Sequence, residues 1–196
     1  MNFRFSQSVL ATAIAMGLVS GAPVQAQNAV PVAEALIAEQ RAAMARVGWM
    51  DGVWRGTVSS SGPEGDIELV QTERIGALAG GTVRLIEGRG YHADGGLAFN
   101  AVAMVTYDPA ADEYVMTSTA RGMTARPWFK ATAEGFNWGI ETGAVSISYF
   151  ARHQDGVWTE EGFMAFAGQP KRRFLTMRLE RVSDTDWPGV GTVGPK

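Results

Sequence analysis

The sequence predicts an all-β protein: an antiparallel up-and-down β-barrel of about 8–10 strands with one N-terminal α-helix. From residue 51 onward, short runs rich in Val, Ile, Thr, Phe, Tyr and Trp alternate with turn sequences such as Asp155-Gly156. These runs show no strand–helix–strand alternation, which excludes a parallel α/β sheet. A long antiparallel meander removes its two edges by closing on itself, so a barrel is expected.

Residues 1–26 have the pattern of a secretory signal peptide. Arg4 supplies the positive start, an uncharged apolar stretch runs from Val9 to Val19, and Val24-Gln25-Ala26 is a small-residue cleavage site. The apolar stretch is too short to cross a bilayer, which takes about 20 residues. We therefore expect a mature chain that begins near Gln27, is periplasmic or secreted, and has no integral membrane span.

Residues 27–50 are expected to form a short linker and the N-terminal helix, which spans Pro31 to Val47. Pro31 suits the first turn of a helix, and Gly48 suits its end. One apolar stripe repeats at helical spacing, formed by Ala33, Leu36, Ile37, Met44 and Val47. Such a stripe predicts a face that packs against the rest of the protein.

Residues 51–182 are expected to form the barrel, and residues 183–196 a flexible C-terminal tail. The tail contains two Pro and three Gly. The expected strands are 52–60, 66–75, 82–89, 97–107, 113–121, 127–134, 136–141, 144–152, 157–167 and 171–182.

The composition excludes several kinds of site. The chain has no cysteine, and a net charge of −3 without a basic run argues against nucleic acid as a partner. The two histidines, His92 and His153, are expected in turns at the solvated surface, and no metal-ligand spacing accompanies them. The glycine-rich stretch 75–81 precedes a strand rather than a helix, so it predicts a turn and not a phosphate site. We expect no cofactor and no metal.

Aromatic, methionine and acidic side chains within the strands are the candidate lining of a pocket. They are Trp128, Trp138, Tyr149, Trp158, Glu160 and Met164. Methionine repacks easily and would make such a pocket adaptable. The same aromatic residues could equally fill a core, and the sequence leaves both alternatives open.

The adjacent residues Glu160 and Glu161 lie in one expected strand, so one of the two points into the barrel. An inward glutamate either pairs with an arginine of the last strand, Arg173 or Arg178, or transfers protons with a raised pKa. No residue can be assigned a catalytic role from the sequence.

Gly52-Val53-Trp54 follows the expected helix and resembles the G-x-W motif of lipocalins. In that family the tryptophan closes one end of the barrel beneath an arginine of the last strand. The resemblance implies a structural plug of Gly52 and Trp54 with either Arg178 or Arg181. A flat indole and a stacked guanidinium are physically suited to that role.

The chain is similar, over roughly residues 31–182, to bacterial exported lipocalin-like domains of unknown function. The shared features are the helix before the G-x-W-x-G motif, Gly80-Gly81, the pair Tyr107 and Asp108, and Tyr114. This resemblance implies a calycin-type barrel with a small-molecule pocket and no assigned activity.

The haem-binding nitrobindins share the G-x-W-x-G start and ten strands. Their motif continues with a glycine where this chain has Val58, and their haem-ligating histidine lies near the C-terminus. No histidine follows His153 here, so the resemblance does not extend to haem.

Three functions remain open. The first is an exported barrel that binds a small apolar or amphipathic molecule. The second is a cofactor-independent barrel enzyme of the isomerase, cyclase or hydratase type, with an inward Glu or Tyr as acid or base and an Arg that holds an anion. The third is an envelope protein-interaction module, which requires an exposed apolar patch on the 31–47 helix. The oligomeric state is not predicted.

Overall fold

A computed structural model describes residues 26–62 and 65–195, so the expected signal peptide lies outside the described residues except for Ala26. The helix α1 (Ala26–Ala45) leads through the short helix η1 (Gly48–Met50) into the sheet. The strands follow in chain order, with the short helix η2 (Ala79–Gly81) after the second: β1 (Gly52–Gly62), β2 (Gly65–Leu78), β3 (Val83–Tyr91), β4 (Leu97–Asp108), β5 (Glu113–Ala120), β6 (Met123–Ala125), β7 (Trp128–Ala131), β8 (Gly135–Glu141), β9 (Val145–Gln154), β10 (Val157–Phe166) and β11 (Arg172–Ser183).

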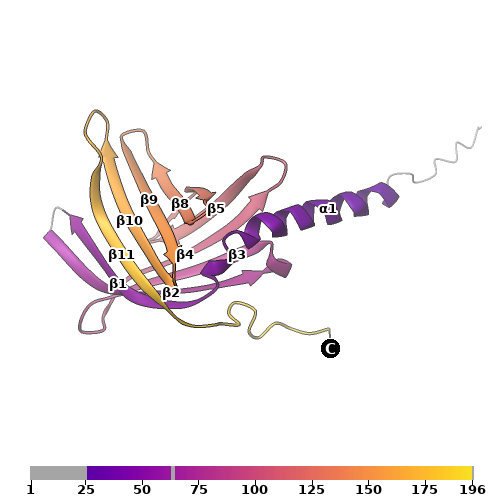
Figure 1. The fold of residues 1–196 in the computed structure, drawn as a ribbon, viewed down its shortest axis with the longest axis horizontal. Coiled ribbons are helices and arrows are strands. Elements are labelled where there is room, and N and C mark those ends of the chain that lie inside the picture. Colours follow the sequence, from indigo (N-terminus) through magenta and orange to yellow (C-terminus); the bar gives the residue numbers. More distant parts are fainter. Residues whose placement is uncertain (1–25, 63–64, 196) are drawn as a thin grey trace, which may run out of the picture.

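The strands form one closed antiparallel ring (Figure 1). Strands that follow one another in sequence pair, except β6 with β7, and the pairing of β1 with β11 closes the ring. β6 and β7 both pair with β5 and share one position of the ring, because Pro127 between them has no N–H to donate. The ring therefore has ten positions, which confirms the predicted barrel, whereas the short β6 was not expected.

The inner face of the barrel follows from the alternation of burial along each strand. On β2 the side chains of Leu69, Gln71, Glu73 and Ile75 are buried, and the residues between them are more exposed. Residues that face each other across an antiparallel pair share a face, so the registers extend this assignment around the ring. Trp54 on β1, opposite Glu73, is thereby also on the inner face.

One end of the barrel is closed. The side chains of Met44, Val47 and Met50, from the end of α1 and from η1, are fully buried against Trp54 and Leu179. Arg84 lies at the same end and forms an ion pair with Asp51, with a distance of 2.9 Å between Arg84 Nε and Asp51 Oδ1. This closed end carries most of the tightly packed core.

The opposite end, where β1 ends and β2 begins, is the open end. Inner-face side chains there reach solvent: Ile67 is 52% exposed, Met123 69% and Phe166 46%. Deeper on the same face, Ile147 and Met164 face each other and are half-buried. The barrel is thus open to solvent at the end opposite the tryptophan plug (Figure 1).

The helix differs from its prediction in two ways. It begins at Ala26 and includes Pro31, whereas the sequence predicted a start at Pro31. The apolar stripe is also divided. Met44 is buried in the barrel, whereas Leu36 and Ile37 are exposed because the first half of α1 projects beyond the strands (Figure 1). The prediction of a packing face is therefore correct only for the end of the helix.

Polar contacts attach the last turns of α1 to the barrel. Gln40 Nε2 donates to the Tyr107 carbonyl oxygen at 2.6 Å, and the Tyr114 hydroxyl donates to the Ala43 carbonyl oxygen at 2.7 Å. None of the helices in the described part of the chain is long and apolar enough to cross a membrane.

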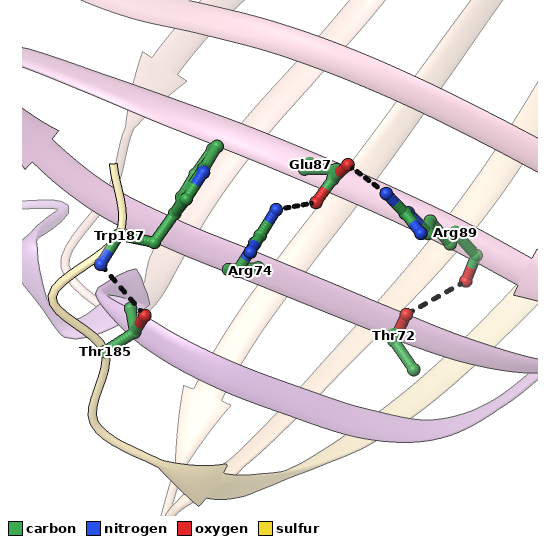
Figure 2. Close-up of polar contacts among 6 residues, drawn as sticks. All are labelled: Thr72, Arg74, Glu87, Arg89, Thr185 and Trp187. Atoms are coloured by element: carbon green, nitrogen blue, oxygen red, sulfur yellow. Dashed lines mark hydrogen bonds and ion pairs between the residues drawn. The ribbon is translucent and has the colours of Figure 1, made fainter. Parts of the chain in front are cut away.

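The segment after β11 crosses the outer face of β2 (Figure 2). The Arg74 guanidinium lies 4.5 Å from the ring centre of Trp187 and also pairs with Glu87 at 2.6 Å. Gly76 permits this crossing, since a Cβ there would lie 1.8 Å from the Trp187 carbonyl oxygen. The part of the expected tail around Trp187 is therefore packed against the sheet.

Candidate binding site inside the barrel

Trp54 and Arg181 meet at the closed end of the barrel. The Trp54 side chain is fully buried, and its indole N–H donates to the Met50 carbonyl oxygen at 2.8 Å. Arg181 faces Trp54 across the β1–β11 pair, and its guanidinium donates to the Asp51 carbonyl oxygen at 2.9 Å. A Cβ on Gly52 would lie 2.8 Å from the same guanidinium, so glycine is required there.

Arg178, the other candidate for the plug, lies on the outer face of β11. It pairs with Glu180 at 2.7 Å, and both side chains are exposed to solvent. Among the four residues of the expected plug, the structure therefore brings together Gly52, Trp54 and Arg181.

An aromatic cluster surrounds Trp54. Trp49 and Trp158 each contact it edge to face, with ring centres 6.1 Å and 5.8 Å away. The His153 ring stacks on Trp49 at 4.6 Å and is half-buried, so its prediction as a solvated surface residue is wrong. His92, at the open end, is exposed as predicted, and the two histidines lie at opposite ends of the barrel.

A cavity of about 100 Å³ lies above this cluster, inside the barrel. Its lining combines aromatic, methionine and acidic side chains: Met50, Glu73, Ile86, Met116, Phe129, Phe136, Trp138, Trp158, Glu160 and Met177. Three of the six predicted pocket residues, Trp138, Trp158 and Glu160, are in this lining. The cavity is large enough for a small polar group but not for a whole lipid.

Glu73 enters the cavity from β2 and is held by its neighbours. Gln71 Nε2 donates to Glu73 Oε1 at 2.7 Å. A Cβ on Gly88 of β3 would lie 2.8 Å from the same carboxyl group, so the absence of a side chain on Gly88 makes room for it. Burial raises the pKa of Glu73 to about 7, although the hydrogen bond from Gln71 lowers it.

Glu160 enters the same cavity from β10 and is 7% exposed. Burial, and then the negative charge of Glu73, raise its pKa to about 8, against a hydrogen bond with Trp138 that lowers it. The neighbouring Glu161 points outward and pairs with Arg173 at 2.6 Å. Of the two alternatives for the inward glutamate, the geometry favours the group with a raised pKa, because no ion pair reaches Glu160 from the described residues.

The remaining predicted pocket residues divide between the two faces of the sheet. The Tyr149 ring stacks on Trp138 at 4.0 Å, and Met164 follows on the same inner face toward the open end. Burial, and then the charge of Glu160, raise the pKa of Tyr149 to about 12. Trp128 lies on the outer face, opposite Gly139, because its neighbour Phe129 occupies the inner face.

A larger groove of about 690 Å³ lies elsewhere, between the end of α1 and the seam where only two residue pairs join β5 to β7. Trp128 lines it, together with Arg46, Arg126 and Lys130. These three cations are exposed to water, and the hydroxyl groups of its two tyrosines, Tyr107 and Tyr114, already donate to Asp112 and to the Ala43 carbonyl oxygen. We regard the smaller interior cavity as the better candidate, since chemical recognition depends on its buried carboxyl groups.

Several lining residues were not singled out as pocket residues from the sequence. Glu73 was recognisable, because alternation places it on the same face as Ile75 and opposite Arg74. Phe136 was also recognisable, because it alternates with Trp138 on the same face of β8. Met50 carried no such signal, since its position depends on how η1 packs into the barrel. In the described part of the chain, no group of three His, Cys, Asp or Glu side chains is arranged to hold a metal ion.

Comparison with solved structures supports the β-barrel fold. No protein-family model matches the chain, and no curated protein matches it in sequence. Among solved structures, the chain is similar to the crystal structure of Rv2717c from M. tuberculosis, with a TM-score of 0.55 and 12% sequence identity. The match covers 71% of this chain and 97% of Rv2717c, and at this identity it shows the fold alone.

Proposed function

We propose that this protein is a small-molecule-binding barrel whose amphipathic ligand lies on the inner face, between the open end and the two buried glutamates. The observation that carries the proposal is the gradient along that face. Exposed apolar side chains such as Ile67 and Phe166 form the rim, half-buried ones such as Met164 follow, and Glu73 and Glu160 lie at the bottom. An apolar wall with a few convergent polar groups is typical of ligand sites.

The proposal also includes export. The pattern of residues 1–26 supports a periplasmic or secreted location, where a carrier or scavenger of small amphipathic molecules would meet its ligand. The lipocalin-like motif at Gly52 and Trp54 supports the same class of protein.

A charged residue on the inner face tests the proposed location of the ligand. Met164→Arg introduces a guanidinium on that face, whereas Thr159→Arg introduces the same group on the exposed outer face of the same strand. We expect the wild type and Thr159→Arg to bind the neutral apolar dye Nile red saturably, with an increase in fluorescence. Met164→Arg should weaken binding by about tenfold or more, since a charge in an apolar site costs at least about 1.4 kcal/mol.

Circular dichroism spectra that match the wild type establish that both variants are folded. Equal binding by both variants would contradict a site on the inner face, and a lack of saturable binding to the wild type would contradict the proposal itself.

A second candidate function is acid–base catalysis in the same cavity. It is favoured by the pKa of Glu160, which lies near neutrality as a general acid or base requires. Deuterium incorporation from heavy water into a bound ligand, present in the wild type and lost in Glu160→Gln, would support this function. A ligand that binds and exchanges no C–H hydrogen would leave binding as the sole activity.

A further inference from the structure

We propose that the interior cavity binds the ammonium group of an organic amine, with Glu73 and Glu160 as its anionic partners. This inference rests on the proposed function and names the chemical class of the group at the bottom of the site. The apolar part of the same molecule would extend toward the open end.

The ionisable groups that line the cavity are all acidic. Both ionisable groups in the cavity lining are carboxyl groups, contributed by β2 and by β10. The buried cation on the inner face, Arg84, already has a partner, because its Nε and Nη2 atoms donate to the two carboxylate oxygens of Asp51 at 2.9 Å and 3.1 Å. A carboxylate or phosphate ligand would therefore find no cation in the lining, whereas an ammonium group would be attracted by the ionised forms of both glutamates.

The aromatic wall of the cavity also favours a cation. Four aromatic rings line the cavity: Phe129, Phe136, Trp138 and Trp158. The faces of such rings attract cations, and the attraction is strongest where water is excluded. Carboxyl groups set among aromatic rings suit an alkylammonium group, which carries both a charge and apolar carbon atoms.

Two buried polar groups in the cavity lining lack a partner of the kind that they need. Glu160 is more than nine-tenths buried and has a hydrogen bond with Trp138, but no cation in the described part of the chain reaches its carboxyl group. The indole N–H of Trp158, which lines the same cavity, is also buried and has no acceptor among the described residues. Unmatched buried groups are rare in proteins, so we infer an occupant. An ammonium group compensates the carboxylates, and an oxygen of the ligand or of water accepts from Trp158.

Binding of an ammonium group should release protons. At neutral pH the carboxyl group of Glu160, with a pKa of about 8, is mostly protonated and that of Glu73, with a pKa of about 7, is partly protonated, because burial disfavours their charged forms. A bound ammonium group stabilises the carboxylate form, so a proton passes from the carboxyl group to the buffer on binding. The observed heat of binding should therefore depend on the ionisation enthalpy of the buffer.

Three probes with one alkyl chain and different head groups test the inference: decylamine, decanol and decanoate, each below its micelle concentration. Isothermal titration calorimetry at pH 7 is carried out in phosphate and in Tris. We expect decylamine to bind at least about tenfold more tightly than the other two probes and to release protons. Glu160→Gln and Glu73→Gln should each weaken decylamine binding by about tenfold or more, because each removes one buried charge.

Glu161→Gln is the matched control, since Glu161 is adjacent to Glu160 and faces outward. It should bind decylamine as the wild type does. If decanol or decanoate binds as tightly as decylamine, or if neither Gln variant weakens the amine, the inference is wrong and the proposed function stands. If none of the three probes binds saturably, the proposed function fails as well.

Discussion

At the scale of single residues, the strongest consequence of the structure is the energetic cost of two carboxyl groups inside an apolar barrel. Glu160 lines a cavity with aromatic walls, and the charge of Glu73 raises its pKa further. Its charged form is therefore destabilised, and the folded protein prefers its proton to remain bound. Proteins retain such groups mainly at functional sites, because a well-packed apolar side chain would be more stable.

This cost predicts how stability depends on pH. The native pKa of Glu160, about 8, lies above its ordinary value of 4.5, so the folded protein holds more protons between these two pH values. The free energy of unfolding must then fall as the pH rises from about 5 to about 8 and level off above that range. Each kcal/mol lost lowers the Tm of a chain of this size by about 2–4 °C.

Thermal melts of Glu160→Gln measure this contribution. The variant should lose less stability between pH 5 and pH 9 than the wild type, and at pH 9 it should be the more stable of the two. Glu161→Gln should follow the wild type, since its carboxyl group is exposed and paired. A Glu160→Gln variant with the same pH dependence as the wild type would show that the carboxyl group is not buried in this manner.

At the scale of elements, α1 consists of a buried end and a projecting start. The buried end packs Met44 into the closed end of the barrel, next to Val47 just after the helix, whereas Leu36 and Ile37 are exposed. The exposed patch is the feature that an interaction module requires, although nothing in the fold shows a partner for it. The two halves should respond differently to mutation.

Met44→Ala should destabilise the protein by about 2–5 kcal/mol, because it removes buried volume from the plug. Ile37→Glu should change stability by no more than about 0.5 kcal/mol, since the side chain is exposed. Urea denaturation measures both values. A large loss on Ile37→Glu would indicate that this face is buried against another chain or another part of the protein.

Local sequence patterns predicted the strands, but not which side chains of different strands come together inside the barrel. Alternation placed Trp158, Glu160 and Gly162 on one face of β10, and the structure shows that this face is the inner one. No local pattern could show that Glu160 shares a cavity with Glu73, because this depends on the circumference of the closed barrel. β6 was missed because its three residues precede Pro127 and resemble a turn.

At the scale of the whole molecule, the open barrel follows an N-terminal segment with the pattern of a secretory signal peptide. From this pattern we predict that an exporting host removes the first 26 residues. Intact-mass measurement and N-terminal sequencing of the protein from that host should therefore find a chain that begins at Gln27. A chain that retains Val9 to Val19 would contradict cleavage and would leave the barrel attached to an apolar N-terminal segment.

The central claim is that a small amphipathic molecule lies on the inner face of the barrel. Methyl NMR of the mature protein, labelled at the seven methionines that follow residue 26, tests it most directly, because these residues sample both faces. With decylamine and with decanol, we predict saturable shifts for the inner-face methyl groups of Met116, Met164 and Met177, and none for Met104, which faces outward on β4. Shifts confined to Met104, or no saturable shift at any inner-face methionine, would contradict the claim.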